Sequence, residues 1–163
     1  MGDLLDEKMV LNQFGEIVKT EWLKTFDILK NLMLDEYIVM PNHFHGIIIV
    51  INNDSRGTLQ RAPTFEQFGK PVSNSIPTVI RSFKSATTKR INEIRATPGI
   101  PVWQRNYYEH IIRKEEPFKR TREYILTNPL RWHLDRENPY RKGEDDFDRW
   151  LEIQFKDGRV SQF

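Results

Sequence analysis

The feature that most constrains the fold of this chain is its longest apolar run, Ile-Ile-Ile-Val-Ile at residues 47–51. Because both faces of this segment are apolar, it is typical of an interior strand that is covered on two sides. The run is far too short to cross a bilayer, so we expect no membrane association. A second β-prone run, residues 37–40, comes just before it, and Pro41-Asn42 suits a turn between the two. We therefore predict a hairpin of strands 37–40 and 43–51.

Three helices are predicted around this hairpin. Residues 11–32 carry a helical apolar pattern. Residues 76–95 form the second predicted helix, with Ser75 as its cap and Pro77 in the tolerant first turn. The apolar side of that helix is expected to hold Ile80, Phe83, Thr87, Ile91 and Ile94. The third helix should run from about Pro117 to Thr127, because a residue before proline, here Asn128, disfavours the α region.

The remaining segments complete an α+β pattern. Residues 102–113 are rich in aromatics and predict a further strand, whereas residues 52–74 are polar, contain glycine and proline, and predict a long loop. Residues 135–163 are interpreted as an irregular tail. A length of 163 residues fits a single domain. An antiparallel sheet with helices on one face is the architecture that this order of elements favours.

Charge and cysteine content narrow the possible functions. The net charge is only +2, but residues 79–122 hold eleven lysines and arginines against four glutamates. Such a local basic field suits a polyphosphate partner, although charge alone favours a solvated helical face. The absence of cysteine excludes disulfides, thiolate nucleophiles and cysteine-based zinc sites. The chain opens without a basic and then apolar leader, so we expect a cytoplasmic protein.

Two pairs of residues carry chemistry at a suitable spacing. His43 and His45 are two positions apart, so on a strand both imidazoles project from one face and can share a divalent ion. Taken alone, such a pair is more often two polar residues at the mouth of a strand. Tyr124 and Asn128 are four positions apart and share one helix face, with Tyr124 at the flank of the apolar stripe and expected to be partly exposed.

These residues lie in segments that resemble one known family. Four blocks of the chain look like those of REP-associated tyrosine transposases, relatives of the insertion-sequence transposases that act on single-stranded DNA with one tyrosine, the HUH type. The resemblance covers about residues 8–139, in the right order and with compatible spacing. The blocks are Tyr37-Ile-Val-Met-Pro-Asn-His-Phe-His-Gly-Ile-Ile-Ile-Val, Ile80-Arg-Ser-Phe-Lys-Ser-Ala, Val102-Trp-Gln-Arg-Asn-Tyr-Tyr-Glu-His-Ile-Ile-Arg and Arg122-Glu-Tyr-Ile-Leu-Thr-Asn-Pro-Leu-Arg-Trp.

The resemblance implies a fold, a reaction and a set of roles. The fold would be a ferredoxin-like antiparallel sheet. His43, His45 and Asn128 would bind Mg²⁺ or Mn²⁺, and Tyr124 would be the nucleophile that becomes linked to a 5′-phosphate of single-stranded or hairpin DNA. The protein would act as a monomer or homodimer in nicking, joining and transposition. His110 is assigned to structure or to a DNA contact. The expected DNA contacts are Arg81, Lys84, Trp103, Arg105, Tyr107, Lys119, Arg120, Arg122 and Arg131, with Tyr108 as a further stacking side chain.

The start of the chain departs from the family pattern. Family members usually open with a strand before the first helix, and residues 1–11 show no such pattern, so the sheet is expected to lack that strand. Two alternatives therefore stand beside the enzyme. One is a binding module of the same fold that has lost turnover, and the other is an RNA-binding domain with stacking aromatics, although no RNP-like motif is present.

Overall fold

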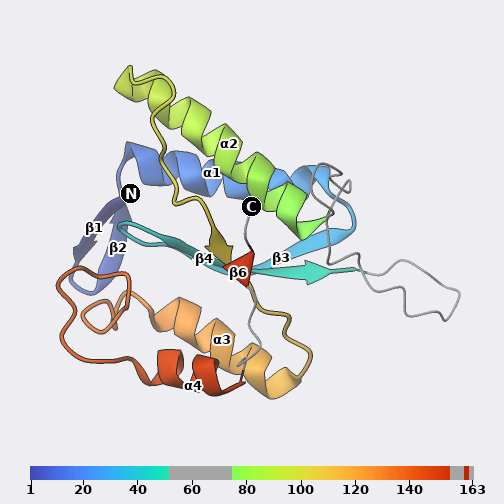
Figure 1. Ribbon diagram of the computed structural model, residues 1–163, viewed down its shortest axis with the longest axis vertical. Coiled ribbons are helices and arrows are strands. Elements are labelled where there is room, and N and C mark those ends of the chain that lie inside the picture. Colours follow the sequence, from blue (N-terminus) through green and yellow to red (C-terminus); the bar gives the residue numbers. More distant parts are fainter. Residues whose placement is uncertain (52–74, 155–159, 162–163) are drawn as a thin grey trace, which may run out of the picture. The chain divides into compact units, whose positions relative to one another are not determined.

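The computed structural model describes residues 1–51, 75–154 and 160–161, so the predicted loop at 52–74 lies outside the described residues. Helices and strands alternate irregularly along the chain, which makes the fold α+β, as predicted (Figure 1). Among the described helices, none has the length and apolar character that crossing a membrane requires. In chain order the elements are β1 (Gly2–Leu5), β2 (Lys8–Leu11), α1 (Gln13–Ile28), β3 (Leu32–Val39), β4 (Phe44–Val50), α2 (Ile76–Arg95), β5 (Tyr107–Tyr108), α3 (Glu115–Thr127), α4 (Asp146–Gln154) and β6 (Val160–Ser161).

The described strands form three two-stranded sheets, β1 with β2, β3 with β4, and β5 with β6. The β3–β4 pair is the predicted hairpin. Its turn is closed by the Met40 N–H, which donates to the His43 carbonyl at 2.9 Å, and at its open end the Ile51 N–H donates to the Asn31 carbonyl at 2.8 Å. These two bonds join the strands in antiparallel order. The first predicted helix, residues 11–32, is too long, because α1 ends at Ile28 and β3 begins at Leu32.

The N-terminal segment contains strands that the sequence analysis did not expect. β1 and β2 pair antiparallel, with Leu5 opposite Lys8. Asp6 and Glu7 between them have φ values of 49° and 60°. A type I′ hairpin turn needs positive φ at both central residues. Residues 1–11 thus contain strands that were not predicted. These strands pair with each other rather than with β4, so among the described residues the β3–β4 sheet has no additional N-terminal strand, as expected.

The predicted strand at 102–113 is also wrong over most of its length. Only Tyr107 and Tyr108 are in a strand, paired with Ser161 and Val160 respectively. The aromatic residues that suggested the strand include Trp103, which lies outside any strand.

By their contacts the described residues separate into two compact units. The first unit contains Met1–Glu16, Glu36–Ile47 and the described part of Asn106–Gln162, and the second contains Ile17–Asp35 and the described part of Ile48–Arg105. Both β3 and β4 contribute residues to each unit.

The second unit is built on α2 and on most of α1, which run alongside each other (Figure 1). Trp22 of α1 meets Phe83 of α2 edge to face, with ring centroids 5.1 Å apart. The bounds of α2 are those predicted, and the Ser75 hydroxyl accepts a hydrogen bond from the Thr78 N–H at 3.3 Å. Ile94 is 51% exposed, so its predicted place on the apolar side is wrong.

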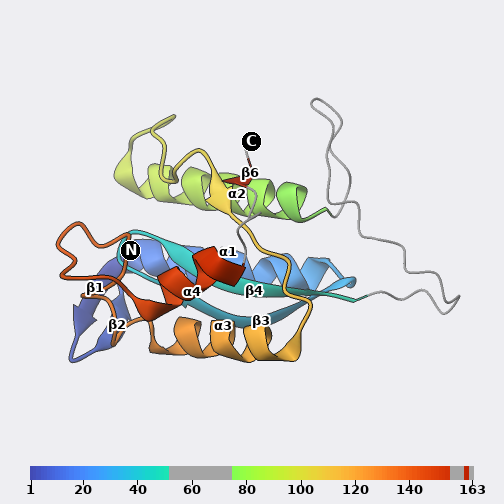
Figure 2. The ribbon, with the colours of Figure 1, turned by 60° about the horizontal axis from the view of Figure 1, so that its bottom comes forward.

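The first unit has its core between α3, α4 and the hairpin. Ile47, Tyr124, Ile125 and Phe147 form this core, with Phe118 packed against it. α3 begins two residues earlier than predicted and ends at Thr127 as predicted, although Asn128 keeps helical angles of φ −55° and ψ −39°. The tail predicted to be irregular contains α4, which lies beside α3 (Figure 2).

Candidate active site

The two histidines lie together where the β3–β4 turn enters β4. Their Nε2 atoms are 2.9 Å apart and their ring centroids 4.6 Å apart. This proximity follows from the two-residue repeat of an extended chain. The His43 Nδ1 lies 3.0 Å from the Asn42 Oδ1, and Trp132 stacks on the His43 ring. The His43 ring is therefore held in place from outside the pair.

The surroundings of the histidines favour their neutral forms. Burial lowers the pKa of His43. Burial, and then the neighbouring His43, lowers the pKa of His45 to about 3. Neutral imidazole is the form that binds metal ions. At neutral pH both rings are thus in the state that a metal site requires.

Asp135 joins the histidines from the segment after α3. Its side chain is buried, and its Oδ2 lies 3.6 Å from the His43 Nε2. One ligand atom each from His43, His45 and Asp135 lies within 4.8 Å of the other two. The Asp135 Oδ1 accepts a hydrogen bond from the Glu137 N–H at 2.8 Å, which fixes the carboxylate. Sequence analysis did not identify Asp135, because no local pattern distinguishes this aspartate from the other acids of the tail.

Tyr124 reaches the same carboxylate from α3. Its hydroxyl donates to the Asp135 Oδ2 at 3.3 Å, and its ring centroid lies 5.4 Å from that of His45. The side chain is only 6% exposed, so the prediction of partial exposure is wrong. The cause is α4, whose Phe147 stacks on the Tyr124 ring at 3.9 Å. Burial, followed by the charges of Asp135 and Asp148, raises the pKa of the hydroxyl, which is protonated at neutral pH.

Asn128 lies one turn after Tyr124 and is also buried. Its Nδ2 donates to the Asp135 Oδ2 at 3.0 Å. Its Oδ1, which was predicted to be a metal ligand, is buried and has no hydrogen-bond partner among the described residues. A buried amide oxygen without a partner is costly, so a water or a cation is the expected complement.

The donor set fits a divalent ion. It offers two imidazole nitrogens and one carboxylate oxygen, which lie within 4.8 Å of one another. Mixed nitrogen and oxygen sets of this kind suit Mn²⁺ and other first-row ions, and Mg²⁺ when water completes its shell. His43, His45 and Asp135 are the residues that would hold the ion.

Five of the predicted DNA contacts belong to the first unit, and the four cations among them have protein partners that account for their positions. The Lys119 Nζ lies 2.7 Å from a Glu115 carboxylate oxygen, and Arg120 lies over the Trp150 ring at 4.6 Å. Arg122 pairs with Glu36 at 3.0 Å, and Arg131 pairs with the buried Asp145 at 2.5 Å. The side chain of Tyr107 is half-buried, and that of His110 lies edge to face against Tyr108. Lys119 and Arg120 are thus the exposed cations of this group.

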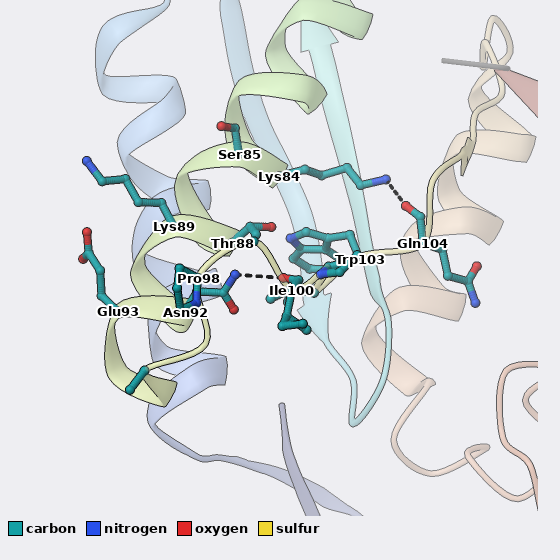
Figure 3. A pocket seen from close by; sticks show the side chains of 14 residues that line it. Lys84, Ser85, Thr88, Lys89, Asn92, Glu93, Pro98, Ile100, Trp103 and Gln104 are labelled. Atoms are coloured by element: carbon teal, nitrogen blue, oxygen red, sulfur yellow. Dashed lines mark hydrogen bonds between the residues drawn. The ribbon is translucent and has the colours of Figure 1, made fainter.

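The other four, Arg81, Lys84, Trp103 and Arg105, belong to the second unit. Lys84 and Trp103 line a hollow of about 750 Å³ between α2 and residues 98–104 (Figure 3). The Lys84 Nζ donates to the Gln104 carbonyl at 2.6 Å, and the Trp103 Nε1 donates to the Thr87 hydroxyl at 2.7 Å. These bonds give both side chains a structural role. Arg81 and Arg105 are exposed.

Comparison with curated proteins places the chain in a family with a bacterial relative. A protein of Haemophilus influenzae, named only as an uncharacterized protein, is 38% identical over 141 residues, which span 82% of this chain and 74% of the relative. The chain belongs to the same family as this Haemophilus protein. No model of a known protein family matches the chain, and no solved structure does. The name of the Haemophilus relative states no activity.

Proposed function

We propose that this chain is a metal-dependent endonuclease and strand transferase of single-stranded DNA, of the HUH type and related to REP-associated tyrosine transposases. The observation that carries the proposal is the convergence on one carboxylate oxygen. The Asp135 Oδ2 accepts the Tyr124 hydroxyl at 3.3 Å and lies 3.6 Å from the His43 Nε2. Tyr124, a side chain that can act as a nucleophile, and His43, a side chain that can bind a metal ion, therefore lie next to the same buried carboxylate.

The proposed reaction is a transesterification at phosphorus. The Tyr124 oxygen attacks the phosphate, the phosphorus–tyrosine oxygen bond forms and the bond from phosphorus to the 3′-oxygen breaks. In the net step the hydroxyl proton of Tyr124 is transferred to the departing 3′-oxygen, which becomes a free 3′-hydroxyl. The phosphotyrosine ester conserves the energy of the broken bond, so a strand end can later take the place of Tyr124. A divalent ion, if bound at His43 and His45, would neutralise part of the negative charge of the phosphate.

The proposed substrate is single-stranded or hairpin DNA, as the resemblance implies. Lys119 and Arg120 are exposed on α3, the helix that carries Tyr124, and offer backbone contacts. Under this proposal the strands belong to a ferredoxin-like sheet, the protein works in the cytoplasm as a monomer or homodimer, and the reaction serves DNA transposition.

A covalent-adduct gel tests the proposal. The chain is incubated with labelled hairpin DNA bearing a single-stranded flank, in the presence of Mn²⁺. We expect a slower band that survives SDS and is absent in Tyr124→Phe. The matched control is Tyr140→Phe, because Tyr140 is 85% exposed and lies outside the site. An adduct that persists in Tyr124→Phe would assign the chemistry to another residue.

A second candidate function is a nucleic-acid-binding module of the same fold without turnover. The burial of Tyr124 favours it, because a nucleophile that is 6% exposed must become accessible before it meets a phosphate. The same gel separates the two functions. A native mobility shift with hairpin DNA, without an SDS-resistant band from the wild-type chain, supports the binding module. A stronger shift with the RNA hairpin of the same sequence indicates an RNA-binding domain.

A further inference from the structure

We infer that Asp135 is the third protein ligand of the metal centre, and that Asn128 acts by positioning Asp135 rather than by binding the ion itself. This inference rests on the metal site of the proposed function. It assigns the third ligand to the segment after α3, instead of to the α3 face where the resemblance implies it.

The first support is an uncompensated buried charge. Asp135 is 2% exposed, and no lysine or arginine of the described residues forms an ion pair with it. A carboxylate without a cation in such a place is strongly unfavourable. A divalent ion at the His43–His45 pair supplies the missing charge.

The contrast with a second buried aspartate sharpens this point. Asp145 is 1% exposed, and Arg131 neutralises it at 2.5 Å. An arginine therefore pairs with one buried carboxylate of the first unit, whereas the other has hydrogen-bond partners but no lysine or arginine partner among the described residues. Those partners are the Tyr124 hydroxyl, the Asn128 amide and the Glu137 N–H.

The second support is the orientation of Asn128. Its Nδ2, not its Oδ1, faces the Asp135 Oδ2 at 3.0 Å. Together with the Glu137 N–H on the other oxygen, this bond fixes the carboxylate plane beside the His43 Nε2. Hydrogen bonds of this kind orient the ligands of metal sites. Asn128 thus holds the ligand, and its unsatisfied Oδ1 is left for a water.

Metal binding by the full chain without DNA tests the inference. Mn²⁺ is titrated into wild type, His43→Ala, Asp135→Asn and Asn128→Ser, and free Mn²⁺ is measured by electron paramagnetic resonance. Asp145→Asn is the matched control, since it makes the same isosteric change at an equally buried aspartate. Circular dichroism and a thermal melt check folding. Asp135→Glu, which keeps the charge, is the second variant if Asp135→Asn does not fold.

We expect Asp135→Asn and His43→Ala each to weaken Mn²⁺ binding about tenfold or more, whereas Asp145→Asn leaves it unchanged. Asn128→Ser should also weaken Mn²⁺ binding, but its loss of affinity should be several times smaller than that of Asp135→Asn. Asp135→Glu should bind Mn²⁺ more tightly than Asp135→Asn. Wild-type affinity in Asp135→Asn, with loss in His43→Ala and Asn128→Ser, overturns the inference and leaves the proposed function standing. A wild-type chain that binds no Mn²⁺ overturns the inference and removes the metal from the proposed function. The adduct gel, run separately, still decides whether Tyr124 reacts.

Discussion

The Tyr124 hydroxyl and the Asp135 carboxylate form a buried hydrogen bond of 3.3 Å. The oxygen that accepts this bond also accepts the Asn128 amide at 3.0 Å and lies 3.6 Å from the His43 Nε2. One carboxylate therefore connects the side chain that was predicted to react with those that were predicted to bind metal. Substitutions of these side chains should therefore change the free energy of unfolding and the formation of the DNA adduct to different extents, and the two effects can be measured separately.

Tyr124→Phe should leave the first unit folded. It removes the hydroxyl but retains the ring that stacks on Phe147 at 3.9 Å, so we expect the free energy of unfolding to fall by about 1 kcal/mol. Phe147→Ala, in contrast, removes a buried ring and should cost about 3–5 kcal/mol. Urea unfolding followed by circular dichroism measures both. Equal losses in the two variants would contradict this account of the packing.

His43→Ala and His45→Ala should each abolish adduct formation while changing hairpin affinity by less than about threefold. The reason is that the two rings point their Nε2 atoms toward each other, 2.9 Å apart, and are uncharged at neutral pH, so neither offers a positive charge to the DNA backbone. Adduct gels and fluorescence anisotropy with labelled hairpin give the two readouts. His133→Ala is the control, because His133 is exposed. If both variants lose hairpin binding while remaining folded, the histidines hold DNA or structure rather than an ion.

Removal of divalent ions should stop the reaction, and the nitrogen and oxygen ligands of the site should determine which ion restores it best. After treatment with EDTA we expect Mn²⁺ to restore the adduct at lower concentration than Mg²⁺, and Ca²⁺ to restore it poorly. Two imidazole nitrogens favour first-row ions, whereas Ca²⁺ prefers a shell of oxygens alone. The measurement is the adduct yield against ion concentration. Full activity in EDTA would show that no divalent ion takes part.

Stability should fall with rising pH because of Asp148. Burial, followed among the raising effects by the charges of Asp145 and Asp135, raises the pKa of Asp148 from 3.8 to about 6. Between these values the folded protein retains a proton that the unfolded chain has released, so the free energy of unfolding decreases as pH rises through this window. Asp148→Asn should therefore melt at a higher temperature than wild type at pH 7, with little difference at pH 4. Glu152→Gln, an exposed change on the same helix, should show no such trend.

Local signals allowed parts of the fold to be predicted. The bounds of α2 follow from Ser75, Pro77 and a clear apolar period, all of which act within a few residues. Other elements depend on distant partners. Tyr107 and Tyr108 form the whole of β5, and their partners are Ser161 and Val160. The first hairpin was missed because its turn is Asp6-Glu7, which lacks the glycine or asparagine typical of positive φ.

The candidate site shows the same division. His43 with His45, and Tyr124 with Asn128, are pairs within single elements, so their spacing along the sequence predicts a shared face. Asp135 belongs to the site only because turns after α3 bring it back toward β4, and no periodicity encodes that path. The burial of Tyr124 likewise depends on α4, which lies in a segment where charged residues obscure the helical pattern.

The central claim is that Tyr124 becomes covalently linked to DNA, and peptide mapping tests it most directly. The wild-type chain is reacted with hairpin DNA and Mn²⁺, digested with nuclease and trypsin, and analysed by mass spectrometry. The chain has five tyrosines, and the account predicts a nucleotide-sized mass increase on the peptide that contains Tyr124 and on no other. A mass increase on the peptide of Tyr37, Tyr107, Tyr108 or Tyr140, with Tyr124 unmodified, would contradict it.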